Sequence, residues 1–168
     1  MKKKPRQLGY LPLEVIEEEI ALPSRERMEK GPVVIIECDE DIPCDPCVES
    51  CKNGAIIKES LTAAPIVDYE KCTGCALCVA ACPGLAIFVV DCSREDNKAL
   101  VYIPYEMLPV PQKGDKGDAL DRSGKRIGSA EVEKVRKGQS GTAVLGILVE
   151  KDLAMNVRSI GIPERSNG

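Results

Sequence analysis

Histidine and tryptophan are absent from this 168-residue sequence, and aromatic residues are scarce, with one phenylalanine and four tyrosines. Without histidine the chain cannot build a Ser-His-Asp or Cys-His nucleophile, a zinc site of mixed cysteine and histidine ligands, a histidine-ligated haem or a Rieske centre. The sequence also lacks the Gly-x-Gly-x-x-Gly fingerprint and the P-loop that bind nucleotide phosphates. We therefore expect no catalytic residues in this chain, and the chemistry that is left is that of the cysteine thiolates.

Long apolar runs are missing as well. The longest, such as Val33–Ile36 and Ala86–Val90, fall far short of the about 18 residues of a membrane-spanning helix. The N-terminus is basic from Met1 to Arg6, but four glutamates between Leu11 and Ile20 interrupt any signal-peptide core. The net charge of -4 gives no nucleic-acid footprint. We expect a cytoplasmic protein that binds neither membranes nor nucleic acids.

The nine cysteines divide the chain into three regions. Residues 1–31 contain none and form an N-terminal extension with two short helices, one ended by Pro23 and the next, over 25–30, capped by Ser24. Residues 32–93 hold all nine, and residues 94–168 again hold none. In a reducing compartment such a pattern indicates metal binding or catalysis more often than disulfides.

Residues 32–93 contain an imperfect internal repeat. Each half has a short apolar run, four cysteines and a second apolar run, namely Val33–Ile36 and Ala55–Ile57, then Pro65–Val67 and Ala86–Val90. The pattern predicts strand, ligand loop, short helix near the last cysteine and strand, twice over. Two such halves form a pseudo-symmetric β-α-β-β-α-β unit in an α+β fold.

The second half carries the more specific motif, Cys72-x2-Cys75-x2-Cys78-x3-Cys82-Pro83, which has the spacing of bacterial [4Fe-4S] sites. Three closely spaced thiolates can hold three irons of one cluster. The fourth cysteine, expected at the start of a helix, points away and binds the other cluster. Thr73 and the loop amides are candidate hydrogen-bond donors to sulfur.

The first motif, Cys38-x5-Cys44-x2-Cys47-x3-Cys51, has a longer first gap, and Lys52 stands where proline usually follows. Crossed ligation then predicts a first cluster on Cys38, Cys44, Cys47 and Cys82, and a second on Cys72, Cys75, Cys78 and Cys51. If the longer loop carries Cys38 away, the first site would hold a three-iron cluster or a labile fourth iron.

Acidic residues crowd the first loop, namely Asp39, Glu40, Asp41, Asp45 and Glu49. Their charge disfavours reduction, so the first site should be the more reducing one unless Lys52 offsets it. Two other interpretations stay open, a solvated loop face and a surface that attracts a basic partner.

Two other uses of the cysteines compete with clusters. Paired Cys-x2-Cys motifs also build four-cysteine zinc sites that only stabilise a fold. A redox dithiol at Cys44 and Cys47 lacks the surrounding α/β pattern. Cys92 is expected to be a small buried hydrophobic residue. With its two motifs, the region 32–93 resembles a bacterial-type dicluster ferredoxin.

Residues 94–168 are too long for a tail. Strands are expected over Ala99–Ile103, Ser129–Val135 and Thr142–Val149, and Asp152 should cap a short helix running through Arg158. Within the second strand, Ala130, Val132 and Val135 are the candidate core residues. Strands separated by glycine-rich turns predict a small all-β, barrel-like module packed on the ferredoxin part.

A second resemblance rests mainly on this region. It is carried by the segments 44–51 (CDPCVESC), 108–115 (LPVPQKGD), 118–121 (DALD), 127–128 (IG) and 151–154 (KDLA). With these the chain resembles the small iron-sulfur subunit of multisubunit flavin-dependent dehydrogenases of proline, hydroxyproline or related amines.

This resemblance implies a non-catalytic subunit in a hetero-oligomer, relaying single electrons through two [4Fe-4S] clusters. FAD or FMN would be on the partner flavoprotein dehydrogenase subunits. The alternatives are a free-standing dicluster ferredoxin, which would not need the C-terminal region, and a zinc-stapled scaffold or assembly protein.

Overall fold

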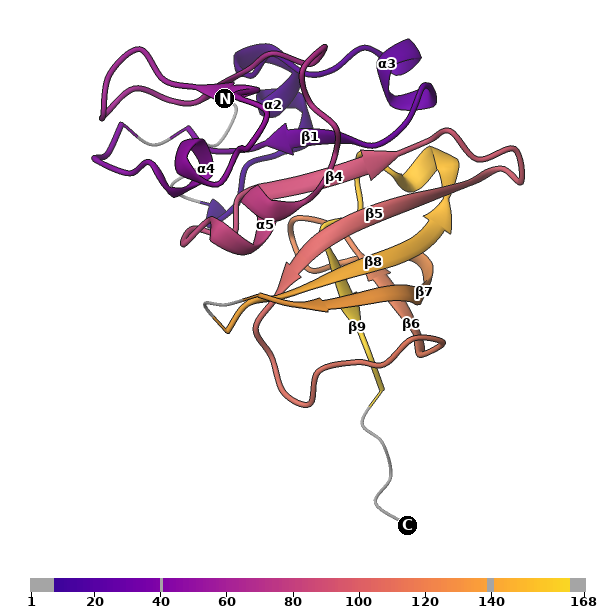
Figure 1. The fold of residues 1–168 in the computed structure, drawn as a ribbon. Helices are drawn as coiled ribbons and strands as arrows, with labels where there is room; N and C mark the ends of the chain where they lie inside the picture. Colours follow the sequence, from indigo (N-terminus) through magenta and orange to yellow (C-terminus); the bar gives the residue numbers. More distant parts are fainter. Residues whose placement is uncertain (1–7, 40, 139–140, 164–168) are drawn as a thin grey trace.

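The computed structural model describes residues 8–39, 41–138 and 141–163. The fold is mixed, with mostly strands and few, short helices (Figure 1). The basic residues Lys2–Lys4 and Arg6, and the acidic residue Glu40, lie outside the described residues. No helix in the described ranges is long and apolar enough to cross a membrane.

The cysteine-rich region contains strand, helix, strand, strand, helix and strand in that order. These are β1 (Val33–Ile36), α4 (Pro46–Glu49), β2 (Ile56–Ile57), β3 (Ile66–Val67), α5 (Leu77–Ala81) and β4 (Ile87–Asp91). Strand β1 pairs antiparallel with β4, and β2 pairs antiparallel with β3 in a separate two-stranded sheet. The first and last strands of this region are therefore neighbours.

The C-terminal strands extend the β1–β4 sheet. They are β5 (Lys98–Tyr105), β6 (Lys116–Leu120), β7 (Arg126–Lys137), β8 (Ala143–Glu150) and β9 (Ser159–Gly161). The seven-stranded sheet has the order β1-β4-β5-β8-β7-β6-β9, so the boundary expected at residue 93 falls inside one sheet. Strand β4 pairs with β1 along one edge and with β5 along the other, so it belongs to the cysteine-rich part and to the C-terminal sheet at once.

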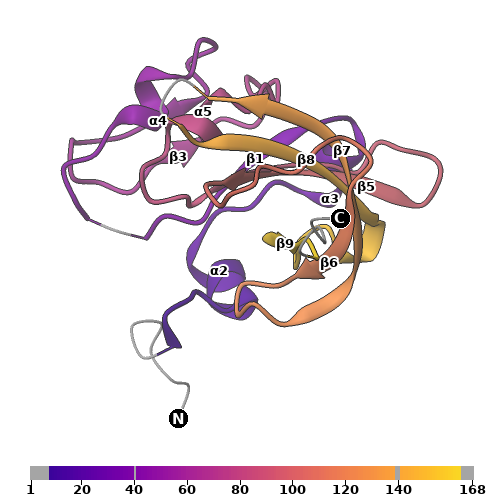
Figure 2. The ribbon, with the colours of Figure 1, turned by 90° about the horizontal axis from the view of Figure 1, so that it is seen from below.

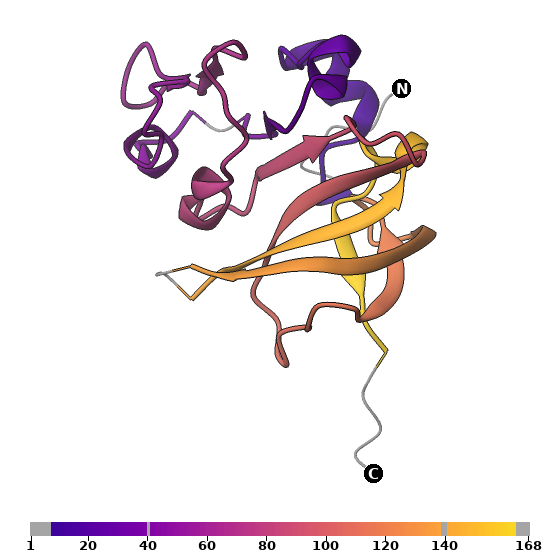
Figure 3. The same cartoon turned by 45° about the vertical axis from the view of Figure 1, so that its right-hand side comes forward.

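The sheet is strongly curved, and its C-terminal strands wrap around their own core (Figures 2 and 3). One cluster of buried side chains, including Ile35, Val90 and Ile147, fills this curved part. The other cluster, including Val34 and Val89, packs against the cysteine loops. Because neighbouring residues of a strand point to opposite faces, β1 contributes to both.

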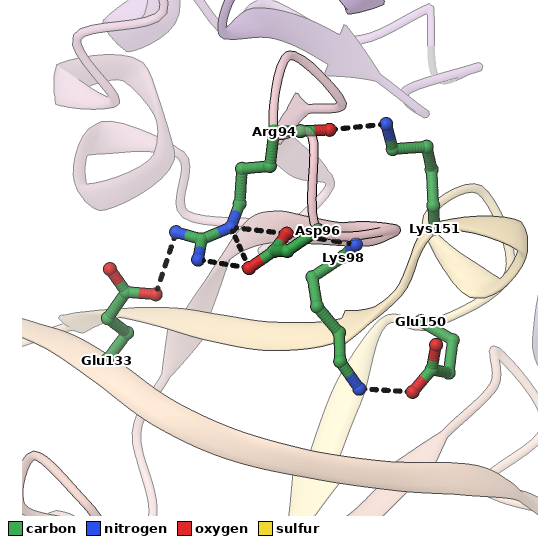
Figure 4. Close-up of polar contacts among 6 residues, drawn as sticks. All are labelled: Arg94, Asp96, Lys98, Glu133, Glu150 and Lys151. Carbon is green, nitrogen blue, oxygen red and sulfur yellow. Dashed lines mark hydrogen bonds and ion pairs between the residues drawn. The ribbon is translucent and has the colours of Figure 1, made fainter.

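Charged side chains fasten the turn between β4 and β5, where the sheet crosses the expected boundary (Figure 4). Arg94 binds Asp96 within the turn and Glu133 on β7, and the side-chain hydrogen bond from Arg94 lowers the pKa of Asp96 to about 2. Lys151 Nζ donates to the Arg94 carbonyl at 2.6 Å, and Lys98 pairs with Glu150. The turn is thus tied to the neighbouring strands of the sheet.

A buried ion-pair network joins β1 to the C-terminal region. The Glu37 carboxylate accepts from Arg122 Nε at 2.9 Å and from Arg158 Nε at 2.7 Å. Arg158 lies over the Phe88 ring, 4.7 Å from its centroid, and burial lowers the pKa of Arg158 to about 10. Since Glu37 directly precedes Cys38, the network fixes the chain where it leaves β1 toward the first motif.

The N-terminal helices are α2 (Leu13–Glu19) and α3 (Arg25–Glu29), and Ser24 caps α3 by accepting from the Arg27 amide at 3.1 Å, as expected. The helix expected from Asp152 through Arg158 is wrong. Only a 3-10 turn, η1 (Lys151–Leu153), is formed, and its N-cap is Glu150, so Asp152 lies inside the turn and not at its cap. The chain instead turns back into β9, which places Arg158 in the buried network.

Candidate metal centres

The structure gathers eight of the nine cysteines into two groups, each around a cavity. The first cavity is partly open to solvent. Its lining consists of Cys38, Cys44, Cys47, Cys82, Ile36, Ile42, Lys58, Pro65, Pro83 and Ile87. Three of its cysteines come from the first motif and one from the second, which is the grouping expected of the first ligand set, Cys38 included.

The second cavity is likewise partly open to solvent. Its lining includes Cys51, Cys72, Cys75, Cys78, Val34, Asn53, Ala55, Ile56, Thr73, Gly74, Ala76 and Val89. Here three cysteines come from the second motif and one from the first. The described part of the chain contains no group of three or more cysteine or carboxylate side chains that could hold a single metal ion.

The two cysteines that line the other motif's cavity each follow one of the two short helices. Cys82 caps the C-terminus of α5, and Cys51 follows α4. Each thiol accepts a hydrogen bond from the amide four residues later, Ala55 to Cys51 at 3.2 Å and Ala86 to Cys82 at 3.5 Å. The expectation that Cys82 begins a helix is wrong, because the left-handed residue Ala76 lets the helix start earlier and include Cys78.

Burial and neighbouring thiols shape the acid-base properties of the buried cysteines. Burial, and after it the repulsion of a thiolate by Cys75, Cys72 and Cys51, raises the pKa of Cys78 to about 12. Burial, and after it the repulsion of a thiolate by Cys82, also raises the pKa of Cys47. Clustered thiols of this kind need positive charge among them to ionise together. The donor set therefore fits an iron-sulfur cluster, whose irons supply that charge.

Three cationic side chains bind the backbone of these cysteines, and none of the three is marked by the sequence motifs. Lys58 Nζ donates to the Cys44 carbonyl at 2.5 Å, and Arg27 Nη2 donates to the Cys72 carbonyl at 2.7 Å. Arg136 Nη1 donates to the Cys75 carbonyl at 3.0 Å. Each lies outside the spacing of the motif it contacts, so no local signal could have found it.

The remaining predictions concern Thr73, Cys92 and the acidic residues of the first loop. Thr73 Oγ1 accepts from Asn53 Nδ2 at 2.8 Å and links the two ligand loops. Cys92 lies outside both cavities, and its burial in the hydrophobic core confirms the expected role. The described acidic residues of the first loop, Asp39, Asp41, Asp45 and Glu49, are exposed.

Comparison with known proteins supports this assignment for the second motif. Residues 65–88 match the family "4Fe-4S binding domain". The chain is 45% identical over 42 residues to the polyferredoxin-like subunit of an aliphatic sulfonate oxidoreductase from Pyrococcus furiosus, covering 25% of this chain and 24% of that protein. It is 39% identical over 74 residues to an uncharacterized ferredoxin of Methanocaldococcus jannaschii, covering 43% and 44%.

A third relative is the pyruvate synthase subunit PorD of Methanothermobacter marburgensis, 41% identical over 49 residues, with 29% of this chain and 54% of that protein covered. The chain thus spans between about a quarter and a half of these relatives. No solved structure matches. Residues 65–88 are accordingly a 4Fe-4S binding segment of the ferredoxin type.

Gly74 provides a test of how tightly the second cavity is built. Its φ is +63°, and a Cβ there would lie 2.5 Å from the Pro32 Cβ. Gly54 has nearly the same φ, +59°, with nothing within 4 Å of its added Cβ. Both alanine variants incur about 1–2 kcal/mol of left-handed strain. Gly74→Ala must also displace Pro32, so it should lower the unfolding temperature further and retain less iron per chain. Equal losses in thermal unfolding and iron content would contradict this packing.

Proposed function

We propose that this chain is an electron-transfer subunit that holds two [4Fe-4S] clusters on crossed ligand sets. Cys38, Cys44, Cys47 and Cys82 would hold one cluster, and Cys51, Cys72, Cys75 and Cys78 the other. The observation that carries the proposal is the pair of cavities, each lined by three cysteines of one motif and the fourth of the other. Each bound cluster would supply reversible one-electron chemistry.

The residues around the cavities suit this chemistry. Backbone amides of Val34, Ala55 and Ala86 donate to Cys72, Cys51 and Cys82, which stabilises thiolate charge. Apolar side chains of β1 and β4 form the inner walls and limit water. Water exclusion and sulfur-directed donors are the protein's means of adjusting a cluster's potential.

The two cavities are close neighbours along the same strand pair. Val34 and Val89 are register partners and line the second cavity, while the partners Ile36 and Ile87 line the first. Residues two positions apart on a strand share a face and lie about 7 Å apart. This short separation supports direct passage of an electron from one site to the other.

The positions of exposed apolar side chains support the proposal that the chain binds a partner protein. Ile42, Ile57, Leu61 and Ile66 are all about half exposed and lie on the segments around the first cavity. A further exposed residue, Leu108, belongs to the loop 107–111, which lines a separate hollow with Ile162. Exposed apolar residues that gather in patches mark interaction surfaces.

We further propose that the partners are flavoprotein dehydrogenase subunits carrying FAD or FMN, which oxidise proline, hydroxyproline or a related amine in the cytoplasm. Three similar proteins are subunits by name, belonging to the aliphatic sulfonate oxidoreductase, to a sulfite dehydrogenase and to pyruvate synthase. The flavoprotein identity rests on the resemblance carried by the segments 44–51 and 108–115.

Serine variants test the crossed ligand sets. Cys51→Ser should weaken the second site, whose other three ligands come from the second motif. Cys82→Ser should weaken the first site, whose other three ligands come from the first motif. Both effects are expected because hydroxyls are poor ligands for cluster iron. Each should lose about half of the iron, or about one iron as a three-iron centre. Cys92→Ser is the matched control and should retain all of it. Iron analysis with EPR spectra assigns the loss. Cys51→Ser should remove the same signal as Cys75→Ser, and removal of the signal that Cys44→Ser removes would contradict the crossing.

Isolation of the assembled protein tests the partner. A tagged chain purified anaerobically from its native cells should carry flavin-containing subunits, and proline or hydroxyproline should bleach the flavin and then reduce the clusters. Released FAD or FMN and the visible spectrum during substrate addition are the measurements. Recovery as a flavin-free monomer would favour the free-standing ferredoxin instead.

A further inference from the structure

The cysteine loops are bound by cations from three separate parts of the chain. Arg27 comes from α3, Lys58 from the position just after β2 and Arg136 from β7. Each donates to a carbonyl of a proposed ligand cysteine. Arg136 differs from the other two because it belongs to the C-terminal strands, which contribute no cysteine.

The β7–β8 hairpin holds Arg136 against the second cavity. Its guanidinium lies over the Tyr102 ring, 5.4 Å from the centroid, and Lys134 Nζ donates to the Tyr102 hydroxyl at 3.1 Å. Tyr102 is buried in the core cluster that faces the cysteine loops. A Cβ on Gly138 would lie 3.1 Å from the Ala80 Cβ, so the hairpin also packs closely on α5.

Of the two arginines at the second cavity, Arg27 is the less suitable one to substitute in a test. Besides Cys72 it donates to the carbonyls of Tyr69, Gly31 and Pro32, so it holds several segments together. Its removal would disturb folding. Arg136 is exposed at the rim and makes one hydrogen bond to the Cys75 loop, so it can be replaced with little structural change.

Given the proposed function, we propose that Arg136 and Lys58 are positioning residues that raise the reduction potentials of the two sites, Arg136 at the second and Lys58 at the first. Reduction of a cluster adds one electron and one negative charge to its site. A cation held beside the ligand loop stabilises the reduced form more than the oxidised form. Charge and hydrogen bonding around the cysteines are established determinants of cluster potential.

The surroundings also predict which site is reduced first. The first cavity adjoins the acidic loop with Asp39, Asp41 and Asp45 and has Lys58 as a cation in its lining. The second has two arginines on its cysteine carbonyls. The second site should therefore have the higher potential, and an electron shared by the two would reside there.

Protein-film voltammetry of the full chain, with iron and sulfide analysis of every variant, tests the proposal. Arg136→Gln removes the charge at the second site, and Lys58→Gln removes it at the first. Lys137→Gln is the matched control, since it removes an equal charge one residue further along β7, where the side chain points to the opposite face. Arg136→Lys keeps the charge and serves as the conservative variant.

We expect Arg136→Gln to shift only the higher-potential wave downward, Lys58→Gln to shift only the lower one downward, and Lys137→Gln to shift neither. Arg136→Lys should retain most of the wild-type reduction potential at the second site. Equal shifts in Arg136→Gln and Lys137→Gln, no shift, or loss of iron in both Arg136 variants would overturn the positioning role. A wild-type chain without iron and sulfide would instead refute the proposed function itself.

Discussion

The antiparallel pairing of β1 with β4 is the contact on which the rest of the structure depends. It joins the first and last strands of the cysteine-rich region, so the two motifs face each other and exchange their fourth cysteines. The pairs Val34–Val89 and Ile36–Ile87 form adjoining walls of the two cavities. A change in this register would move both sites at once, because one residue of slip turns every side chain to the opposite face.

The remaining parts of the chain secure that strand pair from outside. The free edge of β4 takes up β5 and hence the whole C-terminal sheet, while Glu37 at the end of β1 binds two buried arginines. Removing that carboxylate would leave two buried cations without their partner, which costs several kcal/mol in comparable buried pairs. The C-terminal strands thus act as a support for the cysteine-rich part as well as a source of Arg136.

Much of the cysteine arrangement could be predicted from spacing, because three closely spaced thiols and a fourth after a short helix leave few geometries. The strands β4, β5, β7 and β8 were also predictable, since their apolar residues follow strand patterns. Strands β6 and β9 were missed because Lys116–Leu120 mixes glycine with charged residues and β9 has only three residues. The continuous sheet was not predictable, since nothing local says which edge of β4 remains open.

The cationic side chains at the ligand loops could not be predicted from the sequence, for a related reason. Lys58, Arg27 and Arg136 lie 14, 45 and 61 positions from the cysteines whose carbonyls they bind, and exposed lysines and arginines are common in any sequence. Only the folded chain selects these three. Residues that adjust a cluster are therefore harder to find by sequence than residues that hold it.

The most direct test of the account is the metal and sulfide content of the full chain purified without oxygen, with EPR spectra of its reduced form. The account predicts about eight irons and eight labile sulfides per chain, with signals from two spin-coupled clusters. About seven irons with an oxidised three-iron signal would single out Cys38 as a non-ligand. Zinc without labile sulfide would contradict electron transfer and leave a metal-stabilised scaffold.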